Sequence, residues 1–146
     1  MKLVISMMTK DALTDSNIQD AIKILGDNLS ANAKSFTFNY DDSPYCETDI
    51  DIDDFMFTTE NFQNNMEKLI HALEQILSSI PVDIDVIVAN DDTEAEILRY
   101  EKDWNDVGDF GLFVTKRTIP NLKAYYKSNV CNAYLNTTHV SFGIYD

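Results

Sequence analysis

The chain of 146 residues has few residues of the kinds that break regular structure or carry positive charge. It contains four Gly, three Pro and two Cys, and its 11 Lys and Arg stand against 25 Asp and Glu, a net charge of −14. So few Gly and Pro, with 45% hydrophobic residues, exclude a disordered chain and predict a single globular domain over residues 1–146. The shortage of basic residues argues against direct binding of nucleic acid or anionic membrane, because both need a positive surface.

Long apolar runs and a cysteine framework are also missing. Cys46 and Cys131 are too few for a disulfide scaffold; the two could form a single bridge, but we expect both to be reduced. The apolar stretch near the N-terminus, Leu3–Met8, is interrupted by Ser6 and is too short for a signal-peptide core or a membrane span. We therefore expect a cytoplasmic protein that does not insert into a membrane.

The motifs that identify common enzyme and cofactor sites are absent too. The sequence has no G-x-G-x-x-G, P-loop, H-E-x-x-H or C-x-x-C pattern. His71 falls in a predicted helix between Glu67 and Glu74, as a solvated side chain would, and His139 falls at the start of a predicted strand. We therefore expect no catalytic activity and no cofactor.

One segment looks at first like a calcium loop. Glu47–Glu60, ETDIDIDDFMFTTE, has Asp at alternate positions, and counting Asp49 as position 1 places Glu60 at position 12, as in an EF-hand. Position 6, which must turn sharply and is normally Gly, is Asp54, and Ile stands between the aspartates. Alternation with an apolar residue predicts a β-strand whose aspartates share one face, so we expect no metal site.

Hydrophobic periodicity predicts an α+β protein with the order β-α-β-β-α-β in residues 1–90. A capping box at Ser16 and Gln19 would begin the first helix and Gly26 would end it. Thr58 or Thr59 would begin the second, which ends before Pro81. This order is typical of a ferredoxin-like core, with two helices on one face of a four-stranded antiparallel sheet. The predicted strands are Lys2–Met8, Ser35–Tyr40, Thr48–Phe57 and Val82–Ala89.

The residue pattern of positions 90–146 predicts a mixed α/β extension of the antiparallel sheet. Asn90–Trp104 fits either a helix or an exposed strand. Leu112–Lys116 fits a strand, and Pro120 fits the first turn of a short helix. Val130–Leu135 and His139–Tyr145 fit a terminal hairpin.

The acidic residues form a pattern on this predicted fold. If Ile50 and Ile84 face the helices, the aspartates that alternate with them share the opposite face, in two rows about 10 Å apart. Charge on a strand also protects sheet edges and promotes solubility, which is the simpler explanation of the same pattern. A surface with one concentrated sign of charge favours steered association with a partner of opposite charge.

These observations predict an acidic inhibitor that binds a basic protein, with an immunity protein for a cognate bacterial toxin such as a nuclease as the expected class. Two alternatives stay open: a phage-type inhibitor or DNA mimic of a host nucleic-acid-binding protein, and a ligand-binding or enzymatic ferredoxin-like domain. The predicted partner-binding residues are Asp41, Asp42, Tyr45, Glu47, Asp49, Asp51, Asp53, Asp54, Asp83, Asp85, Asp91, Asp92 and Tyr100.

Overall fold

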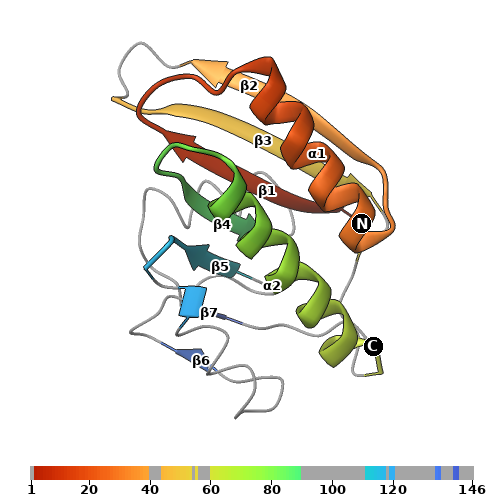
Figure 1. Cartoon of the computed structure of the whole chain (residues 1–146). Coiled ribbons are helices and arrows are strands. Elements are labelled where there is room, and N and C mark those ends of the chain that lie inside the picture. The colour runs from red at the N-terminus through yellow and green to blue at the C-terminus, as the bar shows by residue number, and fades with distance from the viewer. Residues whose placement is uncertain are drawn as a thin grey trace.

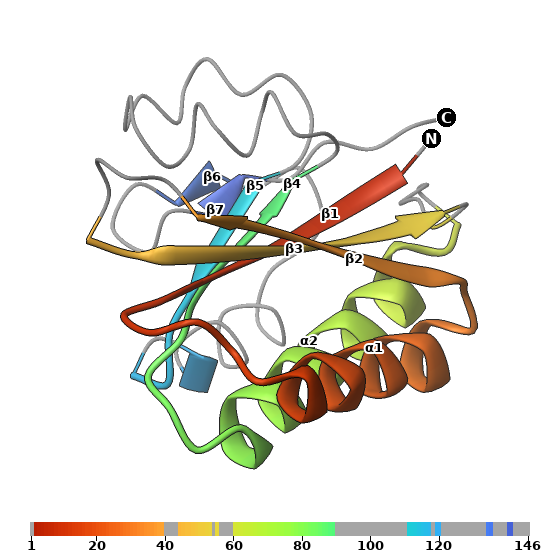
Figure 2. The same cartoon turned by 90° about the horizontal axis from the view of Figure 1, so that it is seen from above.

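A computed structural model describes residues 2–39, 44–53, 55, 60–89, 111–117, 119–120, 134–135 and 140–141. In this part of the chain, two helices lie side by side on one face of an antiparallel sheet (Figures 1 and 2). The α+β class expected from the sequence is confirmed. Neither described helix has the length and apolar composition needed to cross a bilayer.

The sheet is antiparallel at each of its described strand pairs. Its strand order is β2-β3-β1-β4-β5-β7-β6, so β3 and β4 flank β1, as expected from the sequence. The C-terminal strands extend the sheet beyond β4, and β6 and β7 form the expected hairpin pairing. The strands are β1 (Lys2–Thr9), β2 (Ala33–Asn39), β3 (Cys46–Asp53), β4 (Asp85–Ala89), β5 (Gly111–Val114), β6 (Tyr134–Leu135) and β7 (Val140–Ser141).

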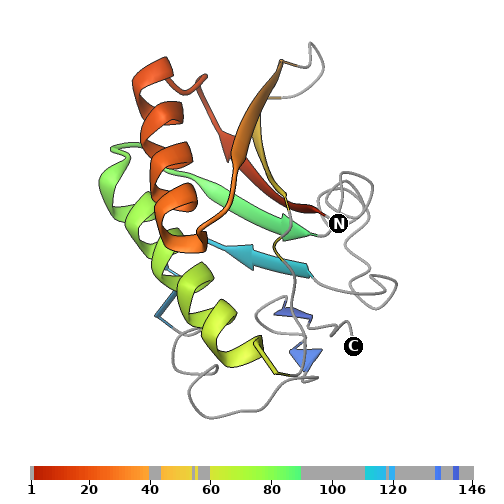
Figure 3. The same cartoon turned by 90° about the vertical axis from the view of Figure 1, so that its right-hand side faces the viewer.

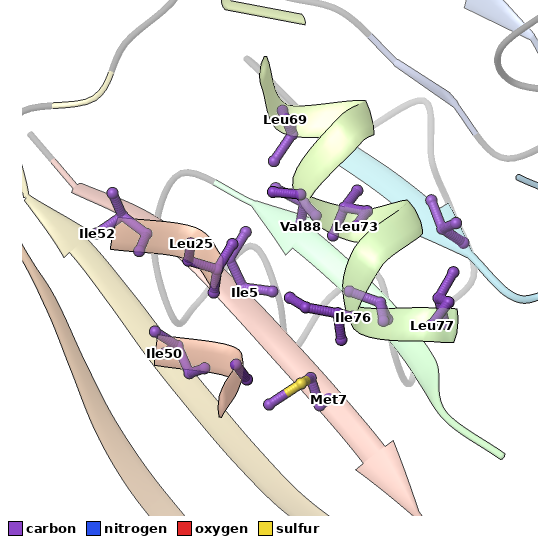
Figure 4. Packing of buried hydrophobic residues seen from close by; sticks show 14 of the residues in the cluster. Ile5, Met7, Leu25, Ile50, Ile52, Leu69, Leu73, Ile76, Leu77 and Val88 are labelled. Carbon is purple, nitrogen blue, oxygen red and sulfur yellow. The ribbon is translucent and has the colours of Figure 1, made fainter. Parts of the chain in front are cut away.

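The main hydrophobic core fills the space between the sheet and the helices α1 (Asp15–Leu29) and α2 (Phe62–Ser79). Every second residue of the central strands enters it, because side chains alternate between the faces of a strand. Apolar residues at helical spacing on α1 and α2 close it from the other side. Figure 4 shows Ile5, Met7, Ile50, Ile52 and Val88 of the sheet meeting Leu25, Leu69, Leu73, Ile76 and Leu77 of the helices.

Helix α1 begins and ends at different residues from those predicted. Thr14 is its N-cap: the backbone is extended there, and Thr14 Oγ1 accepts a hydrogen bond from the Asn17 amide at 3.1 Å. Ser16 therefore lies inside the first turn and is not the cap. The helix continues through Gly26 to Leu29, whose side chain is buried, and the left-handed residue is Ser30, with φ of 53°. Burial of Leu29 favours the extra turn over a stop at Gly26.

The other boundaries differ by a few residues. Helix α2 has Asn61 as its N-cap, whereas Thr58 and Thr59 lie outside the described residues. Strand β4 starts at Asp85 and not at Val82, which is exposed. Strand β3 ends at Asp53, short of the predicted Phe57. Residues 119–120 are helical, as the position of Pro120 predicted, and the segment Asn90–Trp104 lies outside the described residues.

Candidate partner-binding surface

The register of the central strands places the acidic residues of β3 on the face opposite the helices. Ser6 of β1 pairs with Asp49 of β3 on one side and with Ile87 of β4 on the other. Met8 likewise pairs with Glu47 and with Asp85. The predicted sharing of this face by the β3 and β4 aspartates is therefore confirmed for the residues within the strands. Asp83 precedes β4 and belongs to a loop, which corrects its predicted place on the sheet.

The acidic row of β3 is not an open surface along its length. Glu47 and Asp49 are each 6% exposed, and Ser6, beside them on β1, is fully buried. Val4 and Ile87, on the same face, are 0% and 1% exposed. The expectation of an exposed acidic face is therefore wrong for Glu47 and Asp49, which lie among buried residues at the centre of this face.

A signal in the sequence pointed to this burial. Strand β1, KLVISMMT, has apolar residues at both odd and even positions, which is typical of a strand covered on both faces. The hydroxyl of Ser6 donates a hydrogen bond to Glu47 Oε1 at 3.4 Å, a polar contact inside this interior. Asp51 is half-buried, and only Asp53, at the end of β3, is exposed.

Basic residues stand across from the acidic row at its Asp53 end. Lys34 of β2 pairs in register with Asp51, and Lys2 of β1 pairs with Asp53. Opposite charges at directly paired positions stabilise a sheet by about 0.2–1 kcal/mol, whereas like charges destabilise it. The register therefore places a basic residue opposite each of the last two acids of β3, which the sequence pattern alone did not indicate.

Three exposed residues of the predicted site, Tyr45, Asp83 and Asp85, lie at the opposite end of the sheet. We call the loop residues Tyr45, Val82 and Asp83, with Asp85 at the start of β4, the loop edge. These residues lie at or just before the starts of β3 and β4, and this end of the two strands is on the left in Figure 1. Tyr45 is 54% exposed and Val82 39%. Partial burial raises the pKa of Asp85, the nearby Asp83 carboxylate raises it further, and Arg117 opposes both.

The structure separates the remaining predicted site residues from the loop edge or does not describe them. Asp53 lies at the far end of β3, about 23 Å along the strand from its start at Cys46. It therefore does not share one surface with Tyr45. Six predicted residues lie outside the described part of the chain: Asp41, Asp42, Asp54, Asp91, Asp92 and Tyr100.

Two further features bear on cofactors and metals. A hollow of about 360 Å³ lies at the C-terminal end of α1, and its lining includes Gly26, Asn32 and Asp53. Cys46 is a free, half-buried thiol. Within the described ranges, no group of three or more His, Cys, Asp and Glu side chains is placed to hold a metal ion.

Comparisons of the chain with protein-family models, with curated proteins and with solved structures find no match. Function is therefore inferred from the surface itself.

Proposed function

We propose that the protein is an acidic binding protein that neutralises a basic protein partner. The observation that carries the proposal is the loop edge, where the exposed apolar side chains of Tyr45 and Val82 lie at the same end of the sheet as the exposed carboxylates Asp83 and Asp85. Aromatic residues that are buried on binding supply much of the affinity of protein interfaces. The net charge of −14 adds long-range attraction for a positively charged surface.

The partner class that we propose is a bacterial toxin such as a nuclease, with this chain as its immunity protein. A nuclease has an electropositive active site because it binds phosphates, and carboxylates can occupy the positions of those phosphates at Lys and Arg side chains. The chain would then act in the cytoplasm, by covering the toxin, with no catalytic step, cofactor or direct contact with nucleic acid.

We also propose that residues 1–90 form a ferredoxin-like core that presents the loop edge. The support is the order β2-β3-β1-β4 with antiparallel neighbours and two helices on one face. In this arrangement β3 and β4 run in the same direction on either side of β1, so the residues before both strands emerge at one end of the sheet. That geometry gathers Tyr45 and Asp85.

The proposed interface is smaller than the acidic face expected from the sequence. Glu47 and Asp49 are buried, so a partner reaches the loop edge without contacting the middle of β3. Asp83 and Asp85 supply charge there, and Tyr45 supplies a packed anchor. The Asp83 carboxylate contributes to the raised pKa of Asp85, so the two carboxylates are close enough to interact electrostatically.

The test begins with capture of partners from lysates of related bacteria, followed by titration of each recombinant candidate against the full chain. We expect a single basic protein whose affinity falls by tenfold or more as salt is raised, because exposed charges are screened. The variant Asp83→Asn/Asp85→Asn should weaken binding, and Tyr45→Ala should weaken it further. For a toxin, binding should also abolish nuclease activity.

A charge-matched control distinguishes a specific surface from general charge. Asp20 and Asp27 are exposed on α1, and Asp20→Asn/Asp27→Asn removes the same number of charges from a helix outside the loop edge. This control should bind almost as well as the wild type. If both double variants lose affinity equally, attraction depends on net charge alone and the loop edge is not the interface.

A further inference from the structure

Strand β2 forms one border of the sheet. It pairs with β3 along its seven residues, and no described strand pairs with its other side. Figure 3 shows β2 at the border beyond β3, away from β4 and β5. The outward-facing N–H and C=O groups of such a strand form a ready template for a further strand.

The sequence of β2 has almost none of the features that protect an edge from pairing. AKSFTFN contains no Pro and no Gly, and its register with β3 runs without a bulge from Ala33 to Asn39. Lys34 is its one charged residue, whereas edge strands that remain alone are typically short, bulged or rich in charge. At seven residues β2 is longer than the common strand.

The distribution of charge favours a second copy of the chain as the occupant of this edge. The chain carries −14 overall, yet residues 28–40, which include β2, contain no Asp or Glu and one Lys. Two copies therefore repel each other least when they approach through β2. A basic partner, by contrast, would find no carboxylate on β2 to bind.

We propose that the protein forms a homodimer in which β2 pairs antiparallel with β2 of a second copy, joining the two sheets into one. A two-fold axis at residue 36 pairs Ala33 with Asn39 of the second copy and uses the whole strand. The two Lys34 positions are then about 13 Å apart along the strands and do not face each other. Such an isologous contact closes on itself and leaves no free β2 edge.

Pairing of seven residues gives a small interface, so the dimer is weak and concentration-dependent. The affinity of the dimer depends on salt in a direction that the charge of the chain determines. Two chains of like charge repel, and salt screens that repulsion, so the dimer tightens as salt is added. Binding of a basic partner at the loop edge weakens under the same change, which allows the two associations to be tested independently.

Sedimentation equilibrium of the full chain over a range of protein and NaCl concentrations tests the proposal. We expect the average mass to rise from 16.6 kDa toward twice that value with protein concentration, and at lower concentration in high salt. Hydrogen exchange of the peptide that contains β2 should slow as the dimer forms, because its outer amides become hydrogen-bonded.

Two variants with the same charge change identify the edge. Thr37→Lys places a charge at an exposed position of β2, and Asn64→Lys places it at an exposed position of α2. Each lowers the net negative charge by one, so general repulsion would predict slightly tighter association of both. We expect Thr37→Lys to weaken the dimer at least tenfold and Asn64→Lys to preserve it, with unchanged circular dichroism for both.

Three results would overturn the proposal. The first is a mass of 16.6 kDa at every concentration in high salt. The second is a dimer that both variants affect equally, since that dimer uses another surface. The third is a dimer that dissociates as salt is added. None of these depends on whether the loop edge binds a basic protein.

Discussion

At the scale of single residues, Ser6 and Glu47 form a polar contact in the buried centre of the sheet face opposite the helices. The Ser6 hydroxyl donates to Glu47 Oε1 at 3.4 Å, and both side chains are buried. A buried carboxylate that loses a donor keeps the cost of its desolvation, so we expect Ser6→Ala to lower the free energy of unfolding by about 1–2 kcal/mol. Urea unfolding followed by circular dichroism measures this loss.

Ser78 provides the matched control for Ser6. Its hydroxyl donates to the Glu74 carbonyl at 2.8 Å, but the residue is exposed on α2. Water replaces that hydrogen bond when the hydroxyl is removed, so Ser78→Ala should change stability by less than about 0.5 kcal/mol. Equal effects of the two substitutions would show that burial of the acidic row does not determine the stability of this region.

The raised pKa of Asp85 predicts that the stability of the protein depends on pH. Partial burial and the Asp83 carboxylate raise its pKa in the folded protein, so the folded state binds this proton more readily than the unfolded state does. Ionised Asp85 therefore costs stability at neutral pH, and the cost disappears as the pH falls through the raised pKa. Asp85→Asn should stabilise the protein at neutral pH, by less than about 1 kcal/mol because solvent screens an exposed group.

Thermal unfolding across a pH series checks this expectation for Asp85. The difference in Tm between Asp85→Asn and the wild type should be positive at neutral pH and shrink toward zero in acid. Asp83→Asn should reproduce part of the gain, since it removes one cause of the raised pKa. A gain that is constant with pH would indicate that ionisation of Asp85 is not its source.

At the scale of the element, α1 shows how two plausible caps compete. Ser16 and Gln19 have the spacing of a capping box, but Thr14 has the extended backbone and accepts the Asn17 amide. We expect Thr14→Ala to lower the free energy of unfolding by about 1 kcal/mol and Ser16→Ala to change it by no more than a few tenths. Chemical denaturation of both variants measures the difference. The reverse order would place the helix start at Ser16.

Periodicity predicted the central elements well because each has an apolar face that enters the main hydrophobic core. The stripe through Met66, Leu73 and Ile80 located α2, and alternation located β2 and β3 to within a few residues. The helix ends were less predictable, because several Ser, Thr and Asn residues near each end can cap and the choice depends on how far burial extends. Leu29 is such a case: its burial carries α1 past Gly26.

The acidic row shows what local pattern cannot determine. Alternation correctly placed Asp49 and Asp51 on the face opposite the helices. It could not show that the centre of this face is an interior, because the burial of a strand face depends on parts of the chain that are far away in the sequence. The position of Asp83 in a loop and not in β4 likewise depends on where pairing with β1 begins.

At the scale of the whole molecule, the net charge of −14 opposes folding as well as self-association. Repulsion among carboxylates acts over about 30 Å at 0.01 M salt and about 10 Å at 0.1 M. We therefore expect Tm at neutral pH to rise by about 2–4 °C between these salt concentrations, a gain of about 1 kcal/mol for a chain of this size.

Two controls separate this screening from other effects of salt. Near the pI of 4.2 the net charge vanishes, so the same addition of salt should leave Tm almost unchanged. The rise at neutral pH should also be independent of protein concentration in dilute samples, because a contribution from the β2 dimer would grow with concentration. Scanning calorimetry measures the change in Tm with salt at neutral pH and at the pI. An equal rise at the pI would mean that salt stabilises the fold through solvation of its surface and not through relief of carboxylate repulsion.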